Sequence, residues 1–373
     1  MTARRLLRLA VGFLVVGGWL GCAGPPPATE ESGPPIVGVK IYETEREFPG
    51  LFEEWVELGV NTVFVSRSLA LKDAFHETAV RTGTDVFVIF PVFFAPDELA
   101  ADPDLWAVTA DGSRAKEDWV EFACPTRGDF RKKRIEEARE IVREIQPTGL
   151  SIDFIRHFVF WEMVGPERHP ATLPDTCYCS HCLDAFADRV GAENDLRDLA
   201  APDAVAWIAG NAADEWVRFK NNTITTMVEE IAAAAREVDP DILINIHNVP
   251  WRADDYDGAI TRIAGQDRAA LGAVADYLSP MCYSFMLHRS PEWVASVVDD
   301  VARHAGCPVL PSIQVATAYR EGEEFEVAEF EACLRAALAP PSAGVVFWSW
   351  DHIEADPERA EIIRRVVRED NSR

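Results

Sequence analysis

The sequence predicts a (β/α)8 barrel that runs from about residue 36 to residue 373, and three observations carry this prediction. Short apolar runs alternate with amphipathic helical stretches, as parallel βα units require. There are eight such runs, the number of strands in this barrel. The alternative is a doubly wound sheet, but no glycine-rich phosphate loop follows the first run. A single barrel domain is therefore expected.

Each predicted strand is a run of about six to nine residues, rich in β-branched and aromatic side chains. The eight runs span residues 37–42, 61–66, 85–93, 149–155, 241–249, 276–284, 308–315 and 343–350. Between them, apolar residues recur every three or four positions, for example over 128–146 and 216–238. This periodicity predicts the helices of the outer layer.

The composition narrows the classes of partner. The chain has 373 residues, of which 62 are acidic and 36 basic, so its formal net charge is −26. Nucleic acids and anionic membrane surfaces bind clustered lysine and arginine, so neither is expected as the main partner. Neutral ligands remain open.

The first residues have the order of an export signal. A basic start and an apolar run too short to span a membrane end at Leu20-Gly21-Cys22, which resembles a bacterial lipobox. We therefore expect a signal peptide over residues 1–22, a lipid anchor on Cys22 as the only membrane contact, and a proline-rich tether over 23–35. The protein would then face the periplasm or the cell exterior. A simple cleaved signal is the alternative, and Arg4-Arg5 leaves the twin-arginine route open.

Polar side chains cluster where the predicted strands end. Because side chains alternate between the two faces of a strand, several of these residues are expected to point into one mouth of the barrel. They are Asp153, Asn245, His247, Tyr283, Gln314 and Asp351, with Tyr42 and Arg67 beside them. Each one alone has an ordinary structural explanation, such as a buried core histidine or a helix cap. Because all of these residues lie at the same end of the predicted strands, together they favour a binding site there.

Tryptophan is frequent, and flat aromatic faces suit the stacking of sugar rings. Trp161, Trp251, Trp348 and Trp350 lie near the predicted mouth. Alternation turns Trp348 outward, so we expect it to pack against helices. Trp350, at the strand end, is expected to bend over the cleft.

Three motifs resemble a known group of proteins. "GLSIDFIRH", "DYLSPMCYSF" and "GVVFWSWDHI", on the fourth, sixth and eighth runs, are similar to the glycosyl-hydrolase-like barrels of uncharacterised bacterial secreted proteins. The resemblance covers the barrel and implies a carbohydrate-active enzyme. It supplies no substrate, because a fold does not determine a function.

The cysteines form a second motif. Cys124 precedes the cluster Cys177, Cys179 and Cys182, a pattern that resembles the four-thiolate zinc site of the family 42 β-galactosidases. This resemblance implies one structural Zn²⁺, since four thiolates leave no open position for catalysis. His181 is an alternative ligand, and disulfide bonding is the alternative for the whole cluster. The catalytic glutamates of that family have no counterpart, because the fourth run carries Asp153 and the seventh Gln314.

The leading hypothesis is a secreted glycoside hydrolase that acts on an oligo- or polysaccharide without an organic cofactor. Glycosidic cleavage commonly uses two carboxyl groups, and Asp153 is the first candidate, with Arg156 and His157 beside it as substrate-binding candidates. Candidates for the second carboxyl group are, in order of preference, Asp351, Glu162 and Glu43. The alternative is a surface lipoprotein that binds a glycan without cleaving it.

Overall fold

The computed structural model describes residues 34–320 and 322–370, with no account of the side chain of Asn194. The predicted signal peptide over 1–22 lies outside the described residues, as does the predicted tether up to residue 33. Among the described helices, none is long and apolar enough to cross a membrane.

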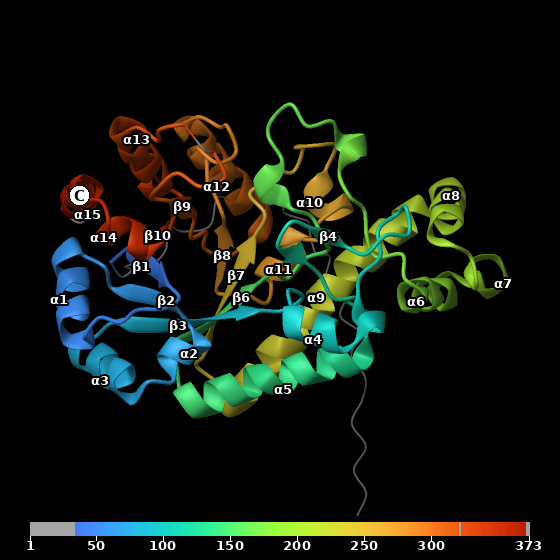
Figure 1. Cartoon of the computed structure of the whole chain (residues 1–373), viewed down its shortest axis with the longest axis horizontal. Helices are drawn as coiled ribbons and strands as arrows, with labels where there is room; N and C mark the ends of the chain where they lie inside the picture. The colour runs from blue at the N-terminus through green and yellow to red at the C-terminus, as the bar shows by residue number, and fades with distance from the viewer. Residues whose placement is uncertain (1–33, 321, 371–373) are drawn as a thin grey trace, which may run out of the picture. The chain divides into compact units, whose positions relative to one another are not determined.

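Eight parallel strands form the barrel, which confirms the predicted fold class (Figure 1). They are β1 (Ile36–Ile41), β2 (Thr62–Ser66), β3 (Asp85–Pro91), β6 (Gly149–Asp153), β7 (Leu243–Asn248), β8 (Tyr277–Pro280), β9 (Ser312–Gln314) and β10 (Gly344–Trp348). Their order is β8-β7-β6-β3-β2-β1-β10-β9. Parallel bridges from Leu278 to Val309 and from Met281 to Ser312 join β8 to the β9 segment and close the sheet.

Helices cover the outside of the barrel (Figure 1). The longer ones are α1 (Phe48–Leu58), α3 (Asp73–Thr82), α5 (Gly128–Ile145), α6 (Ser180–Val190), α8 (Ala201–Asn211), α9 (Ala213–Val238), α12 (Pro291–Ala305), α13 (Val327–Leu338) and α15 (Pro357–Asp370). The short ones are α2 (Arg67–Ala70), α4 (Pro96–Ala101), α7 (Glu193–Leu196), α10 (Ala259–Arg262), α11 (Arg268–Gly272) and α14 (Trp350–Glu354).

The strands are buried on both faces, which is why they read as near-continuous apolar runs in the sequence. In β7, Ile244 and Ile246 belong to the core between the sheet and the helices. A second, smaller core fills the barrel interior with Phe64, Phe87, Ile89, Leu310 and Val346. The rings of Phe64 and Phe87 stack there with centroids 5.1 Å apart. The floor of the barrel is therefore packed and apolar.

β10 approaches β1 very closely where the two strands begin. Gly344 has φ 146°, and a Cβ atom there would lie 2.0 Å from the backbone oxygen of Ile36. Only glycine fits at this position, because any side chain would clash with the neighbouring strand.

A buried polar layer lies above the apolar floor. Ser279 Oγ donates to Asn245 Oδ1 at 2.8 Å, Asn245 Nδ2 donates to Ser151 Oγ at 2.9 Å, and Ser151 Oγ lies 2.9 Å from His247 Nε2. These side chains come from β6, β7 and β8 and point inward, as the alternation predicts. They hydrogen-bond one another, which satisfies most of their polar atoms inside the barrel.

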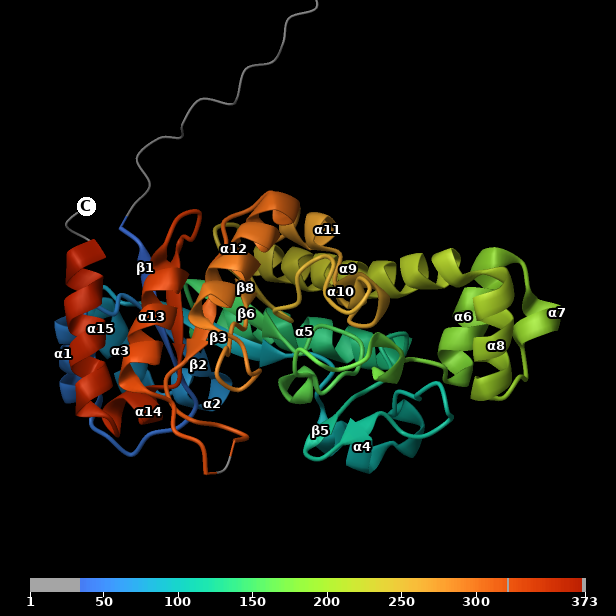
Figure 2. The ribbon, with the colours of Figure 1, turned by 90° about the horizontal axis from the view of Figure 1, so that it is seen from above.

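Two long loops leave the carboxyl ends of β3 and β6. The first carries α4, the turn Pro103–Leu105 and a small hairpin of β4 (Lys116–Glu117) and β5 (Val120–Glu121). The second carries the turns Trp161–Met163 and Pro170–Thr172 and then α6, α7 and α8. Figure 2 shows α6, α7 and α8 grouped at the end of the long helix α9, away from α1 and α15. These loops supply part of the site described next, including Trp119, Arg156 and Glu162.

Candidate active site

Asp153 is the last residue of β6 and stands at the mouth of the barrel. Its side chain is 9% exposed, and its Oδ1 accepts a hydrogen bond from the backbone N–H of Phe154 at 2.7 Å. Phe154 has φ 49°, in the left-handed region that non-glycine residues rarely adopt. The ring of Phe94 stacks on the ring of Phe154 in this conformation, with the two ring centroids 4.8 Å apart.

Asp153 lies in a cleft of about 470 Å³ at this mouth. The lining is mixed, with charged groups, phenols and indole rings in one space. The residues are Lys40, Tyr42, Trp119, Asp153, Phe154, Arg156, Trp161, Glu162, Met281, Tyr283, Tyr319 and Trp348. We refer to it as the carboxylate cleft.

Lys40 enters the cleft from β1 and is almost fully buried. Its Nζ donates to Tyr283 Oη at 3.2 Å, and the ring of Tyr283 stacks on Trp348 with centroids 4.7 Å apart. Burial lowers the pKa of Lys40 to about 8, against the negative charge of Asp153, which acts to raise it. The ammonium form of Lys40 therefore prevails at neutral pH.

The surroundings of Asp153 keep it ionised. Burial acts to raise its pKa, but positive charge at His247, Lys40 and Arg156 and the N–H of Phe154 together hold the pKa below its ordinary value. Burial lowers the pKa of His247 to about 3, so this imidazole is neutral at pH 7. At that pH we therefore assign the stabilisation of the carboxylate to Lys40, Arg156 and the backbone N–H.

Glu162 has the opposite environment. It sits in the turn Trp161–Met163, and its Oε2 is buried with no hydrogen-bond partner among the described residues. Burial raises the pKa of Glu162 to about 7, and the charge of Asp153 adds to this, while Arg156 acts to lower it. The cleft thus holds one ionised carboxylate and one carboxyl group that carries a proton near neutral pH.

Arg156 is buried and lies near both carboxyl groups. Its guanidinium packs over the rings of Phe122 and Phe154, 5.0 and 5.1 Å from the centroids, and one terminal nitrogen lies 3.4 Å from the carbonyl oxygen of Val159. The charges of Glu162 and Asp153 act on its pKa, which burial lowers from the ordinary value. Arg156 therefore supplies positive charge that acts on both carboxyl groups.

Exposed aromatic side chains form the rim of the carboxylate cleft. Trp119 is 41% exposed and Tyr319 is 42% exposed, and Trp119 Nε1 donates to Tyr319 Oη at 2.8 Å. They come from the loops after β3 and β9, 200 residues apart in the chain. Phe160 packs edge-on against both rings. Solvent-facing rings beside buried carboxyl groups suit the binding of a sugar, which has apolar faces and polar edges.

Five of the predicted site residues line the carboxylate cleft: Asp153, Glu162, Tyr42, Arg156 and Tyr283. Others lie elsewhere. His157 is buried beside α9, and Asn245 and His247 belong to the polar layer below. The side-chain amide of Gln314 is held by the backbone of two loops, because its oxygen accepts from the N–H of Met286 and its nitrogen donates to the carbonyl oxygen of Ala316. Arg67 lies at a neighbouring hollow, described below.

Asp351 does not line the carboxylate cleft. The predicted eighth strand extended to residue 350, but β10 ends at Trp348, Ser349 caps the next helix, and Asp351 lies exposed in the first turn of α14. The alternation of a strand does not continue into a helix, so the predicted inward position of Asp351 was wrong. Glu43, the third candidate, is also exposed and outside the cleft.

The expectations for the two tryptophans of the last strand are reversed. Trp348 faces the carboxylate cleft, on the same face as Val346 of the barrel interior. Trp350 is 2% exposed and packs edge-on against Trp55 of α1, with centroids 5.8 Å apart. For Trp348 the reason is strand phase, since an error of one residue exchanges the two faces of a strand. Trp350 lies beyond the end of β10 and begins α14, so strand alternation does not determine its direction.

Sequence reasoning missed Lys40, Trp119 and Tyr319. A signal for Lys40 was present, because a lysine between Val39 and Ile41 in an apolar strand must point to the side opposite the helices. No local pattern marks the other two residues, whose position depends on the paths of two loops.

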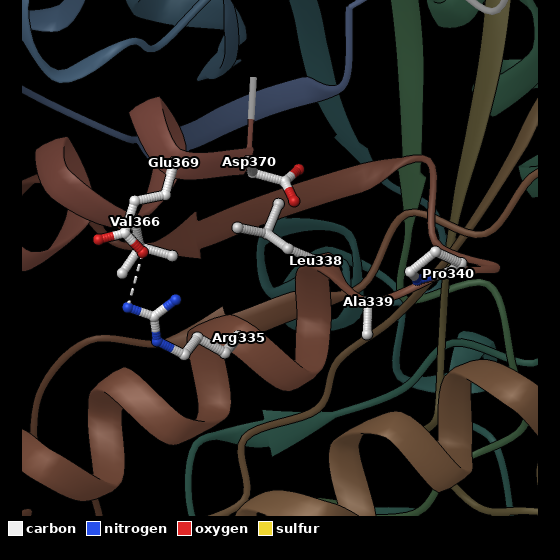
Figure 3. A pocket seen from close by; sticks show the side chains of 7 residues that line it. All are labelled: Arg335, Leu338, Ala339, Pro340, Val366, Glu369 and Asp370. Carbon is white, nitrogen blue, oxygen red and sulfur yellow. Dashed lines mark hydrogen bonds and ion pairs between the residues drawn. The ribbon is translucent and has the colours of Figure 1, made fainter. Parts of the chain in front are cut away.

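A further hollow, of about 480 Å³, lies between the last turns of α13 and α15 (Figure 3). Arg335 in its wall pairs with Glu369 at 2.9 Å. The hollow lies near the segment that leads into the start of β10, so it is at the end of the barrel opposite the mouth. Active sites of such barrels lie at the other end, and we do not assign this hollow to catalysis.

Cys124, Cys177, Cys179 and Cys182 come together as the sequence motif predicts. Their sulfur atoms all lie within 4.8 Å of one another, and Cys124 Sγ is 3.3 Å from Cys179 Sγ and 3.6 Å from Cys182 Sγ. None of the described cysteines forms a disulfide. His181 is exposed and outside the cluster.

The cysteine cluster fits a tetrahedral metal ion. Four sulfur atoms about 2.3 Å from Zn²⁺ stand roughly 3.8 Å from one another, close to the separations found here. The backbone N–H of Val108 donates to Cys177 Sγ at 3.3 Å, a contact that supports a thiolate. The four cysteines can therefore hold a metal ion between the loop after β3 and the start of α6.

Comparisons with known proteins agree with this architecture. No protein-family model matches the chain, and no curated protein matches it. The PgaB (BpsB) glycoside hydrolase domain from Bordetella bronchiseptica superposes with a TM-score of 0.67 and 14% identity, over 90% of this chain and 99% of that one. A β-galactosidase from the Antarctic haloarchaeon Halorubrum lacusprofundi superposes with a TM-score of 0.66 and 14% sequence identity, over 90% of this chain and 58% of that one.

Gan42B, a GH42 β-galactosidase from G. stearothermophilus, gives a TM-score of 0.62 and 15% identity, over 90% of this chain and 57% of that one. This chain thus spans a little under three fifths of either β-galactosidase. The resemblance to glycoside hydrolase barrels, expected from the motifs, is confirmed as a likeness of fold.

Proposed function

We propose that the protein is a glycoside hydrolase that cleaves an O-glycosidic bond of an oligo- or polysaccharide in the carboxylate cleft. Asp153 acts as nucleophile or base, and Glu162 donates the proton to the leaving oxygen. The observation that carries this proposal is the presence of both carboxyl groups in one cleft, with environments that separate their protonation states. The fold shared with glycoside hydrolases supports it.

The remaining cleft residues have consistent roles in this proposal. Lys40 and Arg156 stabilise the ionised Asp153, while Glu162 lines the same cleft as the proton donor to the glycosidic oxygen. Trp119, Tyr319 and Trp348 offer ring faces and polar edges to the sugar. Cleavage follows when the proton of Glu162 reaches the leaving oxygen and Asp153 either bonds the anomeric carbon or activates water.

The cysteine cluster and the export signal complete the proposal. The cluster holds one structural Zn²⁺, which takes no part in the reaction because four thiolates leave no open position. Export and a lipid anchor on Cys22 rest on the sequence motif alone. Mass spectrometry of the native N-terminus tests the anchor, and an unacylated product would count against it.

A screen of the full chain against a library of oligo- and polysaccharides tests the enzymatic role, with the release of new reducing ends as the readout. We expect hydrolysis of at least one glycan by the wild type and none by Asp153→Asn. Binding of a glycan without release of reducing ends would instead support the glycan-binding lipoprotein.

A further inference from the structure

A second hollow adjoins the carboxylate cleft. It is open to solvent, has a volume of about 950 Å³, and shares Tyr42, Asp153 and Phe154 with the cleft. Its other lining residues come from β2, β3, the segments that follow them and α5. They are Ser66, Arg67, Ser68, Ile89, Phe90, Pro91, Phe94, Arg134, Glu137 and Ile141.

The two spaces meet at Tyr42, Asp153 and Phe154. From there the second hollow follows the ends of β2 and β3 out to α5, whereas the carboxylate cleft extends across the mouth to β8 and β10 and also includes Lys40 of β1 and Trp119. A ligand that fills both spaces therefore passes Asp153 at the point where they meet. In a hydrolase, the bond to be cleaved lies at that point.

The wall of the second hollow is mostly apolar. Ile89, Phe90, Pro91, Phe94 and Ile141 contribute side chains without hydrogen-bonding groups. The lining also includes charged and hydroxyl-bearing side chains, which are Tyr42, Ser66, Arg67, Ser68, Arg134, Glu137 and Asp153. Whether a ligand meets an apolar wall therefore depends on how these polar groups are engaged.

The polar groups at the second hollow are occupied by internal partners. Ser66 Oγ donates to Tyr42 O at 2.5 Å and accepts from the N–H of Leu69. Arg67 pairs with Glu144 at 3.0 Å and with Glu137 at 3.6 Å.

Arg134 at the same wall is also engaged, because it donates to Pro91 O and pairs with Glu137 at 2.7 Å. The Nε atoms of Arg67 and Arg134 have no partner among the described residues, but both are buried from solvent. Few hydrogen bonds therefore remain for the hydroxyl groups of a sugar, and an apolar group loses nothing by entering.

We propose that the second hollow binds an apolar aglycone, so that the substrate is a glycan whose reducing end is linked to an alkyl or aryl group. This inference rests on the proposed hydrolase activity. The sugar lies in the carboxylate cleft, and the aglycone lies against Ile89, Phe94 and Ile141. The bond from the anomeric carbon to the aglycone oxygen breaks, Glu162 supplies the proton that releases an alcohol or phenol, and water supplies the new hydroxyl group and restores that proton.

Ser68 provides a variant that fills the hollow without touching the carboxyl groups. It is exposed at the rim, in the short helix α2, so a large side chain can be accommodated there. Ser68→Trp fills the hollow, and Ser68→Ala is the matched control that removes only the hydroxyl group. If Ser68→Trp lowers the unfolding temperature, Phe94→Ala, which removes a ring from the wall, replaces it.

The first experiment measures binding without turnover, by fluorescence titration of the full chain with 4-methylumbelliferone. We expect the wild type and Ser68→Ala to bind this aryl probe alike, and Ser68→Trp to bind at least about tenfold more weakly. Equal binding by all three proteins would overturn the inference, whatever the activity of the enzyme.

The second experiment compares kcat/KM for methyl, hexyl and phenyl glycosides of one sugar. We expect the hexyl or phenyl glycoside to exceed the methyl glycoside by at least about tenfold in the wild type, and this preference to disappear in Ser68→Trp. Hydrolysis of all three at one rate would overturn the aglycone assignment while the hydrolase stands. No hydrolysis at all, with probe binding that Ser68→Trp abolishes, would end the hydrolase proposal and keep the apolar site.

Discussion

The carboxylate cleft and the cysteine cluster both include residues of the loops after β3 and β6, yet their polar atoms are used in opposite ways. In the cysteine cluster the four sulfur atoms face one another within 4.8 Å, and all of them converge on one point. In the carboxylate cleft, Glu162 Oε2 has no partner among the described residues, and Trp119 and Tyr319 turn their rings toward solvent.

This difference separates scaffold from chemistry. A set of ligands that is complete can hold an ion but has no position left for a substrate. A buried carboxyl oxygen without a partner costs free energy in the folded protein, and such a cost persists where a ligand repays it. Changes in the carboxylate cleft should therefore alter rate, and changes in the cysteine cluster should alter stability.

The sharpest test of this comparison is Asp153→Asn. We expect a loss of at least about a thousandfold in kcat/KM, which corresponds to about 4 kcal/mol of transition-state stabilisation. The fold should persist, because the amide keeps the size of the side chain and can still accept the N–H of Phe154. Kinetics and circular dichroism are the measurements. Turnover at the wild-type rate would remove Asp153 from the mechanism.

A second test concerns the proton donor. Because the pKa of Glu162 is about 7 and that of Asp153 is lowered, activity should be highest below pH 7 and fall about tenfold per pH unit above it. We expect Glu162→Gln to lose at least about a hundredfold in kcat/KM for a poor leaving group and to abolish this alkaline decline.

Asp351→Asn is the matched control for the donor, because Asp351 lies exposed at the same end of the barrel and outside the carboxylate cleft. Its pH profile should follow that of the wild type. A loss of activity in Asp351→Asn equal to that in Glu162→Gln would restore Asp351 as the second carboxyl group.

The sequence was sufficient for the barrel and for three of the four clustered cysteines, because these depend on short-range patterns. The family resemblance, and no local pattern, added Cys124, which lies 55 residues before Cys179. Strands buried on two faces give apolar runs, and Cys177, Cys179 and Cys182 are brought together by one helix start. The position of Asp153 was also predictable from the sequence, because it is the last residue of a strand with a clear apolar pattern.

The rest of the site depends on features that no local pattern contains. The true end of β10 decided the positions of Trp348 and Asp351, and a shift of one or two residues changes which face a side chain takes. Trp119 and Tyr319 meet across 200 residues through the paths of two loops. The protonation of Glu162 depends on burial by distant elements, which the sequence alone does not specify.

The cysteine cluster gives the converse test. We expect one Zn²⁺ per chain by elemental analysis, and Cys179→Ser should lower the unfolding temperature by several degrees, because the ion ties two loops together. Activity at low temperature should change by less than about tenfold. Zinc-free wild-type protein with a mapped disulfide among these cysteines would contradict the assignment. Loss of activity without loss of stability would break the comparison itself.

The smallest expected effect is on stability and again concerns Glu162. Burial raises its pKa from an ordinary 4.5 to about 7, so the folded state holds a proton between these values that the unfolded state has released. The free energy of unfolding of the wild type should therefore fall as pH rises from 4.5 to 7 and show no further change from this group above that range. The amide introduced by Glu162→Gln does not ionise, so this variant should lack the fall.

The full pKa shift would correspond to about 3 kcal/mol, but Glu162 lies in a short turn at the mouth and is partly exposed. Because the side chain is partly exposed, water stabilises the charged carboxylate, so we expect about 1 kcal/mol. Urea unfolding of both proteins at pH 5, 6, 7 and 8 measures the effect. The stability of Glu162→Gln relative to the wild type should increase by this amount between pH 5 and pH 8. A difference that stays constant over this range would show that Glu162 is already ionised at pH 5, and the proton donor would then have to be sought elsewhere in the carboxylate cleft.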